Sequence, residues 1–270
     1  MDRRSARPMR IIAIVNQKGG SGKTTTSVNL AATLAVSGRR VLLVDLDPQY
    51  SATQWMDISD VGRGVFDLLA DPENTPTESL IRSTPCENVS IIPSSSWLVG
   101  AEKAMAGEPG AEQCLREKLG ELADKPFDYI LIDCPPTLGV LTVNALNAAR
   151  ELLVPVECHV MGLHGLAQLM KTVDLVKKRL NPDLKLCGIV ACRVDRRTRH
   201  GKEVVEILRE RFAAETLKTE IRENVRLAEC PSQGVPITMY APNSPGAEDF
   251  KSLAKELIAQ EPPKKGRKTS

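Results

Sequence analysis

A glycine-rich run between residues 16 and 25 has the residue types that bind phosphate groups. It reads Asn-Gln-Lys-Gly-Gly-Ser-Gly-Lys-Thr-Thr and directly follows a short apolar segment. Glycines let backbone N–H groups approach phosphate oxygens, and the N-terminus of a following helix adds partial positive charge. In such a loop Lys23 reaches the β- and γ-phosphates of a nucleotide, and the Thr24 hydroxyl binds Mg²⁺. The order of strand, glycine loop and helix therefore predicts a nucleotide site, formed by Gly19, Gly20, Ser21, Gly22, Lys23, Thr24 and Thr25.

Carboxylates stand at the ends of two further apolar segments. Asp45 and Asp47 end the run that begins at Val41, and strand alternation predicts that their side chains point the same way. Asp133 ends the run Tyr129–Ile132, which is the Walker B pattern. A single acid at a strand end is often only a turn former, but several beside a phosphate loop favour a function. We expect a magnesium site that involves Thr24, Asp47 and Asp133, with Asp133 acting through a water.

The elements that position these residues alternate along the chain. Apolar runs predict strands at 11–15, 41–46, 89–92, 129–132, 152–156 and 186–191, and helical patterns occupy 24–37, 112–123, 163–180 and 202–212. Several runs are continuously apolar, which is typical of parallel strands buried on both faces. The sequence therefore predicts an α/β fold, a doubly wound and mainly parallel sheet with helices on both faces. Ligands bind at the carboxyl ends of the strands in such a sheet.

Length and composition restrict the class of protein. The chain has 270 residues, 42% hydrophobic residues, 3% aromatic residues and a net charge of +2. We expect one domain over 10–260, a flexible basic N-terminus over 1–9 and a disordered basic tail over 261–270. The seven cysteines show no metal-ligand spacing, which favours reduced thiols in a cytoplasmic protein. No apolar stretch approaches the ~20 residues of a membrane span.

The phosphate loop and several longer segments resemble one family. Gln17 stands where the usual loop has glycine, and a second lysine, Lys18, stands at the mouth, as in the deviant Walker A motif of the ParA/MinD ATPases. The segments 16–35, 40–49, 127–136, 152–180 and 223–250 resemble the ParA/Soj chromosome and plasmid partition ATPases. The resemblance extends from about Arg10 to Ile258, nearly the whole chain.

The resemblance implies a function and several residue roles. Members hydrolyse ATP slowly with Mg²⁺, form an ATP-sandwich homodimer and bind double-stranded DNA without sequence preference. A ParB-type or other basic adaptor stimulates hydrolysis, so that a chromosome, plasmid or protein assembly is positioned on the nucleoid. By the same resemblance, Lys18 is a catalytic residue that crosses to the partner's phosphates. Asp47 is associated with hydrolysis, and Asn224 lies in the loop that meets the adenine.

Two basic loops are candidates for contacting DNA. One lies within residues 193–202 and contributes Arg196, Arg197 and Arg199, and the other contributes Arg222 and Arg226. Exposed basic loops supply phosphate contacts and salt-dependent affinity, although a merely solvated charged surface is the alternative. Glu223 stands where many relatives carry an arginine, which puts that contact in doubt. Tyr50 likewise replaces a frequent glycine.

Two other functions compete with the main interpretation. A MinD-like ATPase that associates with membranes would need an amphipathic helix at its end, whereas residues 261–270 contain no apolar residue except proline. A metabolic or metal-cluster-handling ATPase on the same scaffold would need cysteine ligands for a cluster. The sequence favours the partition ATPase over both.

Overall fold

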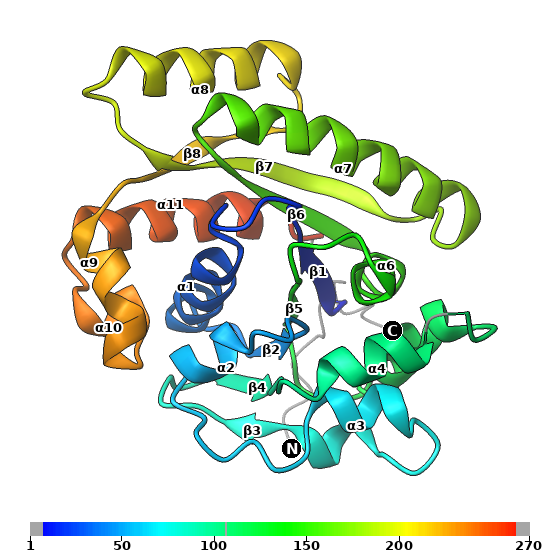
Figure 1. The fold of residues 1–270 in the computed structure, drawn as a ribbon. Helices are drawn as coiled ribbons and strands as arrows, with labels where there is room; N and C mark the ends of the chain where they lie inside the picture. Colours follow the sequence, from blue (N-terminus) through cyan, green and yellow to red (C-terminus); the bar gives the residue numbers. More distant parts are fainter. Residues whose placement is uncertain (1–7, 106, 263–270) are drawn as a thin grey trace, which may run out of the picture.

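One mixed sheet runs through the centre of the molecule (Figure 1). The computed structural model describes residues 8–105 and 107–262, apart from the side chains of 160–164 and 200. Within these ranges the sheet has eight strands in the order β3-β4-β2-β5-β1-β6-β7-β8. The strands are β1 (Arg10–Ile14), β2 (Val41–Asp45), β3 (Arg82–Ser83), β4 (Val89–Ile92), β5 (Tyr129–Asp133), β6 (Glu151–Glu157), β7 (Lys185–Val194) and β8 (Thr216–Arg222).

The strand order confirms the predicted doubly wound topology. β3 runs antiparallel to β4, and the other neighbouring strands pair in parallel. β1 lies between β5 and β6, so the chain builds one half of the sheet on one side of β1 and the other half on the opposite side. Ligands of such sheets bind beyond the carboxyl ends of the strands where the order reverses. That position is occupied here by the glycine-rich loop that follows β1.

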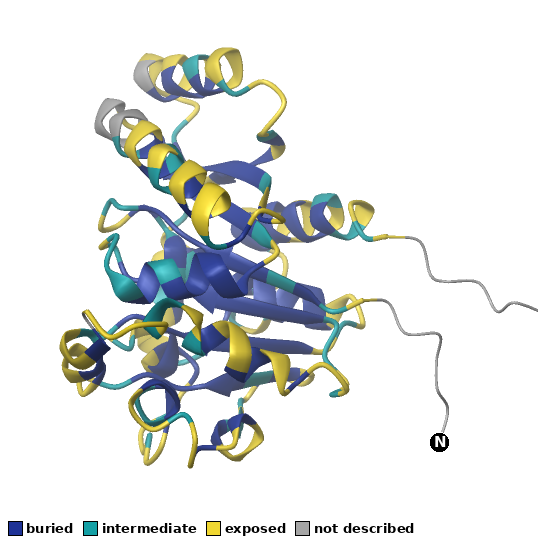
Figure 2. Cartoon of the chain, turned by 90° about the vertical axis from the view of Figure 1, so that its right-hand side faces the viewer, coloured by how far each residue is buried: buried dark blue, intermediate teal, exposed yellow. Residues whose placement is uncertain are grey.

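Helices cover both faces of the sheet and enclose two apolar cores. One face is packed by α3 (Val65–Ala70), α4 (Leu98–Met105), α5 (Cys114–Gly120), α6 (Val140–Ala148), α7 (Val160–Arg179) and α8 (Arg199–Arg211). The other face is packed by α1 (Lys23–Val36), α2 (Ser51–Trp55), α9 (Val225–Glu229), α10 (Ile237–Tyr240) and α11 (Pro245–Ala259). Short 3₁₀ turns lie at Thr77–Leu80, Ala111–Gln113 and Cys230–Gln233. The strands are buried between the two helical layers, while the outer helix faces are exposed (Figure 2).

Several elements differ from the expectation. β3 was not expected, since it is a two-residue strand, Arg82–Ser83, without an apolar run. β8 was not expected either, because its sequence TLKTEIR has two apolar residues, Leu217 and Ile221, instead of an apolar run. β3 and β8 are the two edge strands of the sheet. The helix expected over 112–123 is divided into a 3₁₀ turn and the shorter α5, which ends at Gly120, a residue of low helix propensity.

The expected terminal segments fall mostly outside the described residues. Glu261, the first residue of the expected tail, is described and pairs with Arg39 at 2.8 Å between Oε1 and Nε. Tyr129 also donates its hydroxyl to Glu261 at 2.6 Å. The packed part of the chain therefore includes residue 261.

Candidate active site

The glycine loop has the backbone conformation that a phosphate site requires. Gly20 and Gly22 adopt left-handed φ angles of 75° and 91°, a region that residues with a Cβ atom rarely occupy. Gly22 is also the N-cap of α1, so the first N–H groups of this helix point toward the loop. Backbone donors and the positive end of the helix dipole converge there. An anion such as a phosphate group fits this position.

A cavity of about 530 Å³ opens in front of the loop. The predicted site residues that line it are Gly19, Gly20, Gly22, Lys23, Thr24, Thr25, Asp47, Arg222 and Asn224. Its far part is lined by apolar side chains that include Ile221, Leu227 and Phe250. The cavity therefore joins a phosphate-binding end to an apolar end that suits a base. Asn224 lies at the apolar end, where its Oδ1 caps α9 by accepting the Arg226 N–H at 2.8 Å.

Asp133 lies behind the loop and is fully buried. Its Oδ1 accepts the Ser27 hydroxyl at 2.9 Å, whereas its Oδ2 accepts no well-formed hydrogen bond from any described residue. Burial raises the pKa of Asp133, although nearby Thr24, Ser27 and Lys23 oppose that shift. Burial also lowers the pKa of Lys23, against the attraction of Asp133 and Asp47. A magnesium ion beside Asp133 and a phosphate group beside Lys23 would add further opposite charge at each side chain and stabilise its charged form.

The two carboxylates that follow β2 have different surroundings. Asp47 lines the cavity, and its carbonyl accepts the Ser94 hydroxyl at 2.8 Å. Asp45 is fully buried, and its Oδ2 accepts both the backbone N–H and the hydroxyl of Thr53 at 2.8 and 2.7 Å. We expected the two side chains to point the same way; in the structure Asp47 lines the cavity, whereas the Asp45 carboxylate bonds to Thr53. The strand ends at Asp45, so its alternation does not continue to Asp47.

Lys18 does not line the cavity, and Ser21 is buried within the loop. The Lys18 ammonium pairs instead with Oε2 of Glu157, at 2.5 Å, at the end of β6. Oε1 of the same carboxylate lies 3.3 Å from Nη1 of Arg193, which follows Cys192 in β7 and lines the cavity. Sequence reasoning missed Glu157 and Arg193 as site residues. Their positions near the carboxyl ends of strands were the available signal, the same signal that singled out Asp133.

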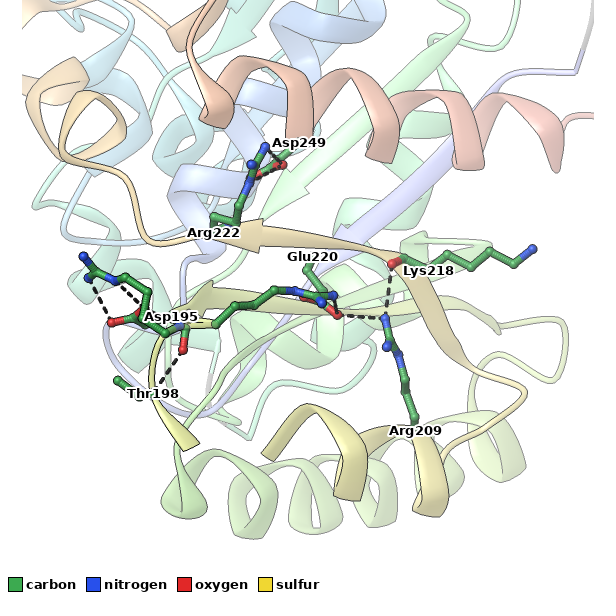
Figure 3. Close-up of polar contacts among 9 residues, drawn as sticks. Asp195, Thr198, Arg209, Lys218, Glu220, Arg222 and Asp249 are labelled. Atoms are coloured by element: carbon green, nitrogen blue, oxygen red, sulfur yellow. Dashed lines mark hydrogen bonds and ion pairs between the residues drawn. The ribbon is translucent and has the colours of Figure 1, made fainter. Parts of the chain in front are cut away.

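The five arginines proposed to contact DNA lie at the ends of β7 and β8 and in the helices that follow. Figure 3 shows the polar contacts of this region. Each of the five pairs with a carboxylate: Arg196 with Glu220, Arg197 with Asp195, Arg199 with Glu203, Arg222 with Asp249 and Arg226 with Glu229. Within residues 193–202 the sequence has Asp195 as the one acid against the basic cluster, and the fold adds Glu220 and Glu203 as partners of its arginines.

The acids in these pairs differ in burial. The Glu220 side chain is 6% exposed, and it accepts Nε and Nη2 of Arg196 as well as Nη2 of Arg209, each at 2.8 Å. The Asp249 side chain is 10% exposed and accepts the backbone N–H and the guanidinium of Arg222. Hydrogen bonds with these carboxylates raise the pKa of Arg196 and of Arg222. Arg197 and Arg199 are 88% and 93% exposed and pair with more accessible acids.

Comparison with known proteins agrees with this geometry. A family model described as an AAA domain matches residues 9–186. The sporulation initiation inhibitor protein Soj of Bacillus subtilis is 47% identical over 252 residues, which cover 93% of this chain and 98% of that protein. The chromosome partitioning protein ParA of Myxococcus xanthus is 43% identical over 261 residues, covering 96% and 91%.

A solved structure gives the ligands of a related site. Cobyrinic acid a,c-diamide synthase from Mycobacterium smegmatis, with bound ATP analogue and magnesium, matches with a TM-score of 0.80 and 33% identity, covering 93% of this chain and 94% of that one. ATP and Mg²⁺, the cofactors expected from the sequence, therefore agree with the ligands of that structure. The glycine loop, the acids around it and the near full-length identity to Soj and ParA together place the chain in the Soj/ParA family of chromosome-partitioning ATPases.

Proposed function

We propose that the chain is a slow ATPase that closes into an ATP-dependent sandwich dimer, binds DNA without sequence preference and positions or segregates a cargo. The cargo is a chromosome, a plasmid or a protein assembly, and a ParB-type partner stimulates hydrolysis. The observation that carries this proposal is that the two lysines of the glycine loop occupy different positions. Lys23 lines the cavity, whereas Lys18 lies outside it at the mouth of the loop.

The place of Lys18 supports the dimer. Its ammonium is 32% exposed and bonds to a side chain outside the cavity, so it is not committed to a nucleotide of its own subunit. A lysine at the open side of the loop can reach phosphates that a second subunit presents. ATP-dependent association follows, because the γ-phosphate supplies the charge that this lysine contacts.

The acids around the loop support slow hydrolysis. Asp47 lines the cavity, from which it would orient an attacking water, and Thr24, Asp47 and Asp133 would hold Mg²⁺ directly or through water. Bound Mg²⁺ would neutralise charge that develops on the transferred phosphoryl group. Water-orienting groups without a further cationic group give low intrinsic rates in such enzymes, and a second protein often supplies the missing element.

The basic loops support DNA binding on the nucleoid. Arg197 and Arg199 pair with acids on the surface, where ion pairs contribute little to stability and exchange readily. DNA phosphates can therefore replace those acids. Arg196 and Arg222 pair with acids that are almost buried, so we assign them mainly to holding β7, β8 and α11 together. Arg226 belongs with the exposed group.

The competing functions have weaker support: the cell division ATPase MinD of Pyrococcus furiosus matches with a TM-score of 0.76 but at 31% identity, below the 47% identity to Soj. No helix in the described ranges is long and apolar enough to cross a bilayer, and the tail that argued against a membrane anchor lies almost entirely outside those ranges. The likeness to the cobyrinic acid enzyme, at 33% identity, is weaker than the 47% identity to Soj.

The test is the oligomeric state of the full chain with Mg²⁺ and ATP. Light scattering should show a dimer for the wild type and a monomer for Lys18→Ala, which should still bind ATP. Lys125→Ala is a matched control, because Lys125 forms an ion pair with Glu78 elsewhere on the surface. A fully dimeric Lys18→Ala protein would contradict the role of this lysine. Filter binding of the ATP-bound wild type to unrelated DNA sequences tests the DNA part.

A further inference from the structure

Glu157 holds two cations at the mouth of the cavity. The Lys18 ammonium lies 2.5 Å from its Oε2, and Nη1 of Arg193 lies 3.3 Å from its Oε1. Each carboxylate oxygen thus has its own positive partner. The Glu157 side chain is 20% exposed, so water screens these pairs less than it screens an ion pair on the open surface.

In this arrangement Lys18 is occupied within its own subunit. In the proposed dimer the ammonium moves to the phosphates of the second subunit, and this movement takes it away from Glu157. Association with ATP therefore has to break the Lys18–Glu157 pair. Breaking a partly buried pair is costly chiefly because it leaves a charge without compensation.

Arg193 is placed to reduce that cost. Its backbone adopts a left-handed φ of 54°, a strained conformation for a residue with a side chain. This conformation puts its guanidinium between Glu157 and Glu223, whose Oε1 lies 3.8 Å from Nη2. When Lys18 leaves, Glu157 keeps the positive charge of Arg193. The Glu157 carboxylate therefore still has a cationic partner.

We propose that Glu157 and Arg193 are positioning residues for Lys18. Glu157 holds the lysine in its own subunit until ATP and a partner are present, and Arg193 weakens this hold so that the lysine can leave. The inference rests on the proposed function, because it assumes that Lys18 moves to the nucleotide of the second subunit.

The proposal predicts opposite effects for the two residues. Glu157→Gln removes the attraction and leaves Lys18 beside the cation of Arg193, so the lysine is released. Arg193→Ala leaves Lys18 as the cation on Glu157 in this contact, so the hold tightens. Two residues with a merely structural role would both weaken the dimer.

The experiment is a titration of the full chain with a non-hydrolysable ATP analogue and Mg²⁺, followed by light scattering. The analogue concentration at half-maximal dimer should fall roughly three- to tenfold for Glu157→Gln and rise by a similar factor for Arg193→Ala. Because Arg193 lines the cavity, its effect on nucleotide binding alone is measured with a fluorescent ATP in the monomeric Lys18→Ala background and subtracted. Glu78→Gln, which breaks the exposed pair with Lys125, is the control and should leave the midpoint unchanged.

The outcomes separate the inference from the proposed function. If the wild type dimerises but Glu157→Gln does not lower the midpoint, or both variants shift it in the same direction, the positioning role is wrong and the dimer stands. If the wild type stays monomeric with the analogue, the proposed function is wrong and the positioning role with it. Glu157→Asp, which keeps the charge but shortens the side chain, provides a second variant should Glu157→Gln fold poorly, and it should lower the midpoint less.

Discussion

The glycine loop and the arginine loops both carry many charged residues, but these charges differ in their burial and in their ion-pair partners. Around the glycine loop, burial works against the charged forms of Lys23 and Asp133, and one oxygen of Asp133 accepts no well-formed hydrogen bond from the described residues. In the arginine loops, each of the five arginines expected to contact DNA already has a carboxylate partner. A site whose buried charges are not fully neutralised is organised in advance for a ligand. A surface whose charges are paired has to exchange partners before it binds one.

The largest effect should come from Lys23→Ala. Lys23 is the cation at the phosphate end of the cavity, so its loss should abolish ATP binding, measured with a fluorescent ATP or by calorimetry. Lys18→Ala is the matched control and should bind ATP as a monomer. ATP affinity that survives in Lys23→Ala would remove the main distinction between the two regions, because the loop would then not depend on its charge.

Asp47→Ala should reduce turnover by at least about tenfold while leaving ATP binding and dimer formation intact. Asp47 faces the cavity, whereas Asp45 is bonded to Thr53. The measurement is phosphate release from the ATP-bound dimer, with DNA retention as a second readout, since a dimer that hydrolyses slowly stays on DNA. Unchanged turnover would transfer the role to Asp133.

The glycine loop, Asp47 and Asp133 could be located from the sequence because local chain geometry determines them. A loop between a strand and a helix, or an acid at the end of a strand, lies at the carboxyl edge of the sheet, where ligands bind. The ion-pair partners could not be located in this way. Arg196 meets Glu220 across 24 residues, and Lys18 meets Glu157 across 139. These pairs depend on which strands become neighbours, which local spacing does not encode.

The same reason explains the other misses. Asp45 is the last residue of β2, and its carboxylate bonds to Thr53 instead of lining the cavity. The apolar run in the sequence does not show at which residue the strand ends. β8 has two apolar residues among seven, a composition that an edge strand shares with many loops. Tyr50, for which the sequence offered no account, has a left-handed φ of 45°, a conformation that glycine adopts more readily than a residue with a Cβ atom.

A smaller effect should divide the arginines themselves. Arg222→Ala takes the guanidinium away from the almost buried Asp249, so the free energy of unfolding in urea should fall by about 1 kcal/mol, discounted for the exposure of Arg222. Arg199→Ala should leave stability unchanged, because its pair with Glu203 lies on the surface. It should instead reduce the slope of log DNA affinity against log salt by about 0.9. The reverse pattern would mean that burial of the acid does not decide which arginines are available to DNA.

The smallest effect concerns Glu223. This residue lies between the nucleotide cavity and the arginine loops, so it tests where one region ends and the other begins. The sequence left open whether Glu223 opposes DNA or pairs with Arg222 or Arg226. The structure shows a third arrangement, in which Glu223 lines the cavity and its Oε1 lies 3.8 Å from Arg193. The side chain is also 56% exposed, at the end of the loop that carries Arg222, so it remains within reach of a DNA backbone.

Glu223→Arg should therefore tighten DNA binding and steepen the salt slope by up to about 0.9, since it removes a repulsive charge and adds a phosphate contact. Filter binding across a salt series must be done at saturating ATP analogue, because the substitution also removes one partner of Arg193 and can shift the analogue concentration needed for dimerisation. Glu223→Gln separates the two contributions: it relieves the repulsion but adds no contact, so it should raise affinity less and leave the slope nearly unchanged. If both variants alter only the analogue concentration at half-maximal dimer and not DNA affinity, Glu223 belongs to the rim of the nucleotide cavity, and DNA passes along the loop of Arg197 and Arg199 without reaching it.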